Sequence, residues 1–239
     1  MQLSKRLKAV ADFVTKGNRV ADIGCDHAYT SIYLAKNQIS PYIIAMDINQ
    51  GPIDRAKDNI IKYGCEALIE PRKSSGLEKL KVGEADSIII AGMGGALMVQ
   101  ILTDKLEVMK SVGELILQPQ SEIYKVRQFL KGQELIIQEE NMLKEDGKYY
   151  VIMKAISRTL VKDDSKYQLM KEEHFHYGRL LLEQQNLVLK EFLLWDLEIC
   201  NQITNTLVYN DSIQIERRVK ELKERMQLIQ RGLGYYVVS

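Results

Sequence analysis

Over its first 158 residues the chain alternates short apolar runs of β-forming residues with stretches of helical pattern, and this feature constrains the fold most. Strands alternating with helices, such as Pro52–Tyr63 and Ile123–Lys131, indicate βαβ units and a mostly parallel sheet. The last two apolar runs are joined by the polar stretch Lys144–Lys148, which predicts an antiparallel pair at a sheet edge. We expect strands at Arg19–Gly24, Tyr42–Asp47, Ser87–Gly92, Glu114–Gln118, Leu135–Glu139 and Tyr150–Ile156.

After residue 158 the strand pattern stops and a helical pattern takes over. Residues 165–207 are predicted to be helical with a break at Gly178, and the turn residues of Asn205–Ser212 separate them from a second helix. Apolar residues of that helix recur at steps of four and three, which is typical of a coiled-coil seam: Ile215, Val219, Leu222, Met226 and Ile229. We therefore expect an α/β domain at 1–159 and a helical coiled-coil hairpin at 160–239.

The composition fits a folded protein and excludes several classes. Apolar residues make up 46% and charged residues 27% of the 239 residues, which excludes disordered and collagen-like chains. Basic residues number 33 and acidic residues 32, so any contact with nucleic acid needs a local patch rather than overall charge. No apolar run approaches the roughly 18–20 residues that cross a membrane. We expect no membrane partner.

The N-terminal segment and the cysteines indicate the compartment. Residues 1–17 have apolar side chains at helical spacing but no continuous apolar core, so we expect a folded helix rather than a signal peptide. The cysteines Cys25, Cys65 and Cys200 are far apart and odd in number. Reduced thiols in a cytoplasmic protein are the simplest interpretation.

The first chemistry-bearing motif is the turn after the first predicted strand. Gly24 allows a sharp turn and the close approach of a ligand, and Asp22 and Asp26 flank it with negative charge. Two carboxylates would repel a phosphate, whereas a cationic or amino-bearing ligand would be attracted to them. S-adenosylmethionine carries both a sulfonium and an ammonium group. The alternative interpretation is an ordinary tight βα turn.

The second motif is Asp47, at the end of the next predicted strand and 23 positions after Gly24. A carboxylate at this place can accept two hydrogen bonds from a ribose 2′,3′-diol. An exposed acid at a strand end is common, so the pair of motifs at this spacing is more specific than either alone.

The third motif, from Gly92 to Gly95, is similar to a dinucleotide fingerprint but departs from it. Its sixth position is Leu97, and the next strand ends in Gln118 rather than in an acid that would hold a ribose. We therefore expect a glycine-walled pocket floor, with a simple tight turn as the alternative. The Gln118 amide both donates and accepts, so it can read the edge of a base. Together the motifs are typical of class I S-adenosylmethionine-dependent methyltransferases.

The segments DIGCDHAYT, AMDIN, AGMGGALM and LILQPQ, followed by a helical hairpin, closely resemble the bacterial TrmK family, which methylates N1 of adenine 22 in tRNA. The resemblance implies a Rossmann-like catalytic domain, S-adenosylmethionine as donor, and a coiled-coil domain that helps to hold tRNA. It carries the cofactor contacts over to Asp22, Gly24 and Asp47. The family usually has Gly-Asp-Gly-Leu after the third strand, whereas this chain has Ser74-Ser75-Gly76-Leu77. Ser75 accepts a hydrogen bond from the adenine amine more weakly than a carboxylate does.

The expected cofactor-binding residues extend this set with neighbours in the three motifs and in the Ser74–Leu77 segment: Asp22, Gly24, Cys25, Asp47, Ile48, Ser75, Gly76, Gly92, Met93 and Gly94. We expect Asp26 and His27 to stabilise the positive charge of a methylated base, Gln118 to position that base, and Tyr29 to stack on it. The alternatives are that His27 caps the following helix and that Tyr29 packs in the core. The histidines after residue 160 lack further ligands nearby, so no metal site is expected.

Two groups of basic residues are candidates for the phosphate backbone of tRNA. Within 213–231 six basic residues face three acidic ones, and the N-terminal helix adds three more basic residues. The expected tRNA contacts are Lys5, Arg6, Lys8, Arg217, Arg218, Lys220, Lys223 and Arg225. A solvated coiled-coil face is the alternative. A monomer is favoured, although the seam of the hairpin can also be satisfied between two chains.

Other functions stay open on the residues alone. A methyltransferase acting on a small molecule or a protein would not require the hairpin. A non-catalytic Rossmann-like scaffold with a partner-docking hairpin is a second alternative, to which the serines at 74 and 75 give some weight. A nicotinamide-dependent oxidoreductase is disfavoured by the incomplete fingerprint.

Overall fold

The computed structural model describes residues 2–207 and 213–236, and the chain divides into two compact units between Tyr167 and Gln168. The sequence placed this boundary a few residues earlier, at 159/160. The intervening residues stay with the first unit because the 3-10 turn η2 (Ser165–Tyr167) packs on the last strands and Arg158 forms an ion pair with Asp164 at 2.6 Å.

The described part of the first unit contains a seven-stranded sheet in the order β3-β2-β1-β4-β5-β7-β6. The pairs from β3 to β5 are parallel, and β7 runs antiparallel to both β5 and β6. The strands are β1 (Val20–Ile23), β2 (Ile43–Asp47), β3 (Ile69–Lys73), β4 (Ser87–Gly94), β5 (Glu114–Ser121), β6 (Leu135–Glu145) and β7 (Lys148–Ser157). All six predicted strands are confirmed, and the predicted antiparallel edge pair is β6–β7.

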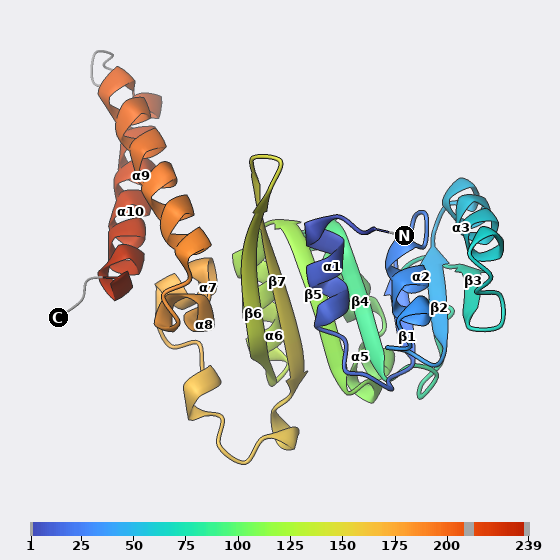
Figure 1. Cartoon of the computed structure of the whole chain (residues 1–239). Coiled ribbons are helices and arrows are strands. Elements are labelled where there is room, and N and C mark those ends of the chain that lie inside the picture. The colour runs from blue at the N-terminus through green and yellow to red at the C-terminus, as the bar shows by residue number, and fades with distance from the viewer. Residues whose placement is uncertain (1, 208–212, 237–239) are drawn as a thin grey trace. The chain divides into compact units, whose positions relative to one another are not determined.

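Helices cover both faces of this sheet. In Figure 1, α1 and α2 lie on the near face and α6 lies on the far face. The helices of this unit are α1 (Lys5–Asp12), α2 (Tyr29–Lys36), α3 (Gln50–Lys62), α4 (Gly95–Asp104), α5 (Leu106–Ser111) and α6 (Ile123–Gly132). Alternate strand residues point to opposite faces, so Ile43, Ile89 and Ile116 join the core beneath α1, α2 and α3.

Strand β3 is absent from the prediction because its sequence lacks the apolar pattern of a strand. Of its five residues only Ile69 is buried, and Pro71 lies in its middle. An edge strand tolerates proline because it pairs on one side only. The β6–β7 turn, by contrast, has a clear signal in Asp146-Gly147, where both residues have positive φ (49° and 74°), as a tight hairpin requires.

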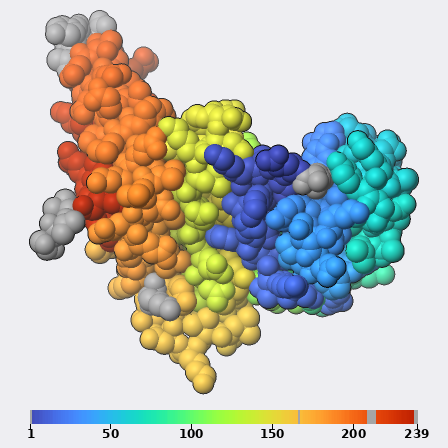
Figure 2. Space-filling model, in the orientation of Figure 1, coloured from blue at the N-terminus to red at the C-terminus, as the bar shows by residue number. Residues whose placement is uncertain are grey.

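The N-terminal helix lies at the surface of the first unit. The space-filling view shows the N-terminal segment in dark blue beside the β6–β7 hairpin in yellow-green (Figure 2). Ser4 caps α1 by accepting from the Leu7 N–H at 3.2 Å. The carboxylate of Glu145, at the end of β6, accepts from the Lys5 and Arg6 N–H groups at 2.6 and 3.2 Å. The free donors of the first helical turn are thus satisfied by Ser4 and by the hairpin together.

The second unit is helical, with its elements at α7 (Glu172–Tyr177), α8 (Arg179–Glu183), α9 (Leu187–Leu207), α10 (Ile213–Leu233) and η3 (Gly234–Tyr236). Gly178 (φ 85°) ends α7 as predicted, and a second break near Gln185 (φ 53°) has no proline or glycine to announce it. The predicted turn at Asn205–Ser212 falls on the end of α9 and on residues 208–212, which lie outside the described residues.

Helices α9 and α10 pack against each other and run antiparallel. Leu193 lies beside Gly232, whereas Asp196, further along α9, binds Arg225, earlier in α10. The predicted seam is the least exposed stripe of α10, with Leu222 and Ile229 buried. No helix in the described part of the chain is long and apolar enough to cross a membrane.

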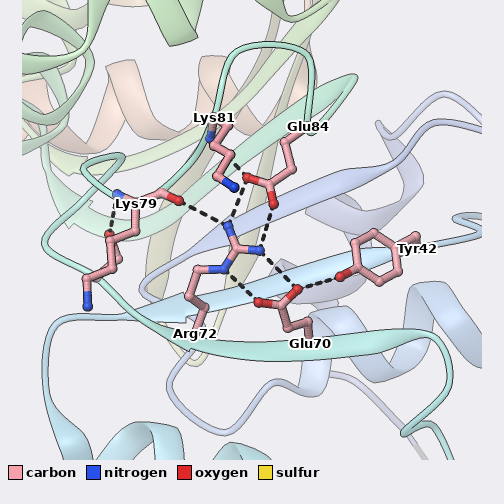
Figure 3. A network of polar contacts seen from close by, with 7 residues as sticks. Tyr42, Glu70, Arg72, Lys79, Lys81 and Glu84 are labelled. Carbon is pink, nitrogen blue, oxygen red and sulfur yellow. Dashed lines mark hydrogen bonds and ion pairs between the residues drawn. The ribbon is translucent and has the colours of Figure 1, made fainter.

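A polar cluster joins the outer strands to the loop that follows β3 (Figure 3). Arg72 donates to both carboxylate oxygens of Glu70, to both of Glu84 and to the Lys79 carbonyl at 2.7–3.0 Å. Tyr42, immediately before the neighbouring strand β2, donates to Glu70 at 2.5 Å. Every N–H of the guanidinium is therefore used, and the loop carrying Ser75 is anchored at both ends.

This cluster predicts acid sensitivity. Hydrogen bonds from Arg72 lower the pKa of Glu84 from 4.5 to about 2, so its contribution to stability is complete above pH 4.5 and is lost as the pH falls toward 2. Glu84→Gln should lower the free energy of unfolding by about 1–2 kcal/mol at pH 7 and by much less near pH 3. Urea unfolding at both pH values measures this, with the exposed Glu66→Gln as control. A deficit that is equal at both pH values would contradict the prediction.

Candidate functional site

The turn after β1 has an unusual backbone. Gly24, Asp26 and Ala28 all have positive φ (75°, 46° and 56°), and the last two are not glycines. The Gly24 and Cys25 N–H groups donate to the Met46 carbonyl on β2 at 2.8 and 3.0 Å, which fixes the turn. Such strain is held only where the surroundings determine it, and it concentrates at ligand sites.

Asp22 lies buried beneath this turn. Its carboxylate accepts a hydrogen bond from the Ser31 hydroxyl on α2 at 2.7 Å. Burial raises the pKa of Asp22 to about 6, although the Ser31 bonds act in the opposite direction. A buried carboxylate with one hydroxyl partner is stabilised in its charged form by a nearby cation.

Asp47 ends β2 at the same edge of the sheet. Its Oδ1 accepts from the Asn49 N–H at 2.9 Å, and in the described residues its second oxygen has no partner. Its carbonyl accepts from the Ser74 N–H at 2.9 Å, which brings the turn after β3 next to it. Ser74 is buried, whereas Ser75 is exposed beside a cavity of about 280 Å3 that also reaches Ile101 on α4.

The glycine motif at the end of β4 faces the first turn directly. A Cβ at Gly24 would lie 2.3 Å from the Met93 methyl group, so a side chain there would displace Met93. A Cβ at Gly95 would lie 2.6 Å from the Ser121 carbonyl, so only glycine fits. The ends of β1, β4 and β5 therefore pack closely at these glycines, and the pocket floor stays a prediction.

Asp26, His27 and Tyr29 form a cluster on the α2–α3 side of the turn. Asp26 binds Arg55 of α3 at 2.7 Å and lies 3.4 Å from the His27 Nε2. The His27 and Tyr29 rings stack with centroids 5.3 Å apart. The α2 N-cap is Ala28, without a side-chain hydrogen bond, and Tyr29 is 38% exposed, so neither the capping nor the core alternative holds. Arg55 had no local signal, because its partner lies 29 positions away in the chain.

Gln118 belongs to a different cluster. It is fully buried, and its Oε1 accepts from the Arg6 Nη1 at 2.8 Å and from the Gly92 N–H at 3.1 Å. Its Nε2 donates to the Pro119 carbonyl at 3.2 Å. The amide is therefore occupied on both sides and has no free edge for a base. These contacts indicate that Gln118 positions Arg6 and Gly92 and does not make the predicted contact with a base.

Several of the predicted tRNA contacts have acidic partners within their own unit. Arg225 donates to Asp196 at 2.7 and 3.0 Å, and Arg217 and Arg218 both lie within ion-pair distance of Glu221. Lys8 pairs with Asp12 in the same way. The exposed Lys5, Lys220 and Lys223 belong to no ion pair within the described residues. The local basic excess is thus smaller than the sequence count indicated.

The remaining reactive groups are structural in this fold. Burial and the nearby carboxylates raise the pKa of the Cys25 thiol well above its usual range, so it is not a nucleophile. Burial lowers the pKa of His174, whose Nε2 lies 2.9 Å from the Tyr235 hydroxyl. Within residues 2–207 and 213–236, no group of three His, Cys, Asp or Glu side chains is arranged to hold a metal ion.

The chain is similar to known methyltransferases over nearly its full length. Residues 3–153 match the family model described as a methyltransferase domain. A tRNA (adenine(22)-N(1))-methyltransferase of Bacillus subtilis (strain 168) is 34% identical over 239 residues, covering 98% of each chain.

Solved structures agree. The B. subtilis M1A22 tRNA methyltransferase TrmK has a TM-score of 0.86 at 34% identity and covers 97% of this chain and 99% of its own. M. capricolum TrmK, in complex with S-adenosyl-homocysteine, has a TM-score of 0.77 at 26% identity and covers 96% of this chain and 100% of its own. The chain belongs to the family of tRNA (adenine(22)-N(1))-methyltransferases.

Proposed function

We propose that this protein transfers a methyl group from S-adenosylmethionine to N1 of adenine 22 in tRNA. The observation that carries the proposal is the convergence of the Gly24 turn, the Asp47 carboxylate and the Gly92–Gly95 motif at one edge of a methyltransferase sheet. Ligands of open α/β sheets bind at this edge, outside the carboxyl ends of the strands. The substrate, tRNA, and the position, adenine 22, are inferred from the names of the similar proteins.

The residues at this edge fit S-adenosylmethionine. The negative charge of Asp22 suits its cationic end, and the oxygen of Asp47 that has no partner in the described residues suits a ribose hydroxyl. Ser75 is exposed in the turn next to Asp47, where it can accept from the adenine amine. When bound, the cofactor supplies an electrophilic methyl group on a sulfonium.

Adenine N1 carries a lone pair in the neutral base, so the protein needs no strong base to activate it. Its task is to hold N1 in line with the methyl group and to exclude water. The methylated base is positively charged until its N6 side loses a proton. Asp26, held between Arg55 and His27, offers a carboxylate to that charge, and the exposed face of Tyr29 offers a stacking surface.

The proposed partner is tRNA, and its base must be unstacked before it reaches the site, at a cost of a few kcal/mol. We place the protein in the cytoplasm as a monomer, with the first unit (residues 1–167) as the catalytic domain and the second unit (residues 168–239) as the helical domain that contributes to tRNA binding. In that domain Lys220 and Lys223 are exposed and are candidates for phosphate contacts.

The proposal predicts that the protein forms N1-methyladenosine on unmodified tRNA. Labelled S-adenosylmethionine, followed by nucleoside analysis, measures the product, and a tRNA with adenine 22 replaced by another base should give none. Asp26→Ala should lower kcat at least 10-fold, because product charge loses its stabilisation, with little change in cofactor affinity. Label that persists in the substituted tRNA would keep the methyltransferase and reject the position.

A second prediction concerns pH. Because burial raises the pKa of Asp22 to about 6, cofactor binding at lower pH requires that Asp22 releases a proton. The affinity for S-adenosylmethionine should be flat above pH 7 and fall up to about tenfold per pH unit below 6. Titration calorimetry in buffers of different ionisation enthalpy measures how many protons are released when S-adenosylmethionine binds.

Matched variants isolate the group responsible. Asp22→Asn should bind more weakly at pH 7 and lose the pH dependence, whereas the exposed Asp54→Asn should behave as the wild type. An unchanged pH profile in Asp22→Asn would assign the titration to another group.

A further inference from the structure

Two polar side chains converge on Gly92, the first glycine of the motif at the end of β4. A Cβ at this position would lie 3.5 Å from the Arg6 Nη1 and 3.7 Å from the Gln120 Nε2. Gly92 has a φ of 81°, and its N–H is held by the buried Gln118 amide. The missing side chain therefore leaves an approach to the backbone that is flanked by a guanidinium and an amide.

Arg6 is held firmly but lacks a counter-ion. Its backbone N–H is bound by Glu145, its Nη1 donates to Gln118, and its guanidinium lies 5.5 Å from the centre of the Tyr150 ring. The guanidinium forms no ion pair within the described residues, and the residue is half-buried. A positioned and partly desolvated guanidinium with neutral partners binds an oxyanion such as a phosphate, often by two parallel hydrogen bonds.

The side-chain amide of Gln120, unlike that of Gln118, is free to bind a ligand. It lies two positions further along β5, is exposed, and has no hydrogen-bond partner among the described residues. Its amide therefore has an open acceptor and two open donors beside Gly92.

The chemistry of the reaction restricts how adenine can be recognised. N1 must face the methyl group, so the Watson–Crick edge is not fully available to the protein. The N6 and N7 atoms remain, as a donor and an acceptor side by side, and the amide of glutamine complements this pair with two hydrogen bonds. Guanine presents two acceptors at the same edge, so the contact selects adenine.

We propose that Gln120 and Arg6 form the subsite for the target nucleotide, with the Gln120 amide on N6 and N7 of adenine and the Arg6 guanidinium on an adjoining phosphate. Gln118 and Glu145 are positioning residues that hold Arg6 in this place. The inference rests on the proposed function, because it concerns the nucleotide that receives the methyl group.

The base contact is tested with a tRNA whose target adenosine is replaced by 7-deazaadenosine, which lacks N7. In the wild type this replacement should lower kcat/KM about 10-fold, and Gln120→Ala should lower it by a similar factor on normal tRNA. The two changes together should cost little more than either one alone. The exposed Gln128→Ala on α6 is the matched control and should keep the full 7-deaza effect. A full additional loss in Gln120→Ala would overturn the contact.

The phosphate contact is tested by the salt dependence of tRNA binding. Arg6→Gln should lower the slope of log affinity against log salt by about one and leave the affinity for S-adenosylmethionine within twofold. Arg6→Lys, which keeps the charge, should keep the slope. Arg19→Gln is the control, because Arg19 pairs with Asp86 at the opposite end of β1 and β4. A lower cofactor affinity with an unchanged slope would assign Arg6 to the cofactor carboxylate and overturn the proposal.

The wild-type reaction separates the two hypotheses. A wild type that forms no N1-methyladenosine at position 22 rejects the proposed function. A wild type that forms it while the Gln120 and Arg6 variants match their controls rejects only the subsite. Melting temperatures of all variants exclude a loss that is due to unfolding.

Discussion

The parallel pairing of β1 with β4 sets the geometry on which the rest of the site depends. Its register, from Val20 opposite Ser87 to Ile23 opposite Ile90, ends β1 just before the glycine motif of β4 begins at Gly92. The turn at Gly24 therefore meets the glycine motif, and the Met93 methyl group fills the place where any other residue would carry a Cβ. A shift in this register would separate Asp22, which we expect to bind the cofactor, from the backbone that we expect to face the methyl group.

The buried Gln118 amide connects this centre to the N-terminal helix. One carboxamide oxygen holds both the Gly92 N–H and the Arg6 guanidinium, so the shape of the glycine turn and the position of the cation are coupled. Glu145 binds the start of α1 and keeps the helix on the β6–β7 hairpin. We therefore expect the helix to contribute to the site itself, whereas its basic residues alone would indicate only a charged surface patch.

Periodicity and turn chemistry predicted six strands and the antiparallel edge pair, because buried strands need apolar runs and tight hairpins need residues such as Asp146-Gly147. The edge strand β3 was not predicted, because it buries only one apolar residue, Ile69, and is covered mainly by polar contacts. Gln118 and Gln120 differ by two positions and share one residue type, so only the structure separates the buried amide from the open one. The ion pair between Asp26 and Arg55 could not be predicted either, because the two residues lie 29 positions apart in the sequence.

An enzyme that modifies one nucleotide of a folded RNA must recognise both the base and its position. The charges of this chain indicate how the second task is done. Contacts to a base edge distinguish adenine from other bases but cannot distinguish adenine 22 from other adenines. Position must then come from the shape of the tRNA, which is read through its phosphates. In the hairpin two acids, Asp196 and Glu221, pair with three of the expected cations, which reduces the charge that is left for non-specific attraction. A weakly charged helical surface, where we propose that tRNA binds, favours a matching RNA shape over RNA in general, because binding then depends on several contacts being made together.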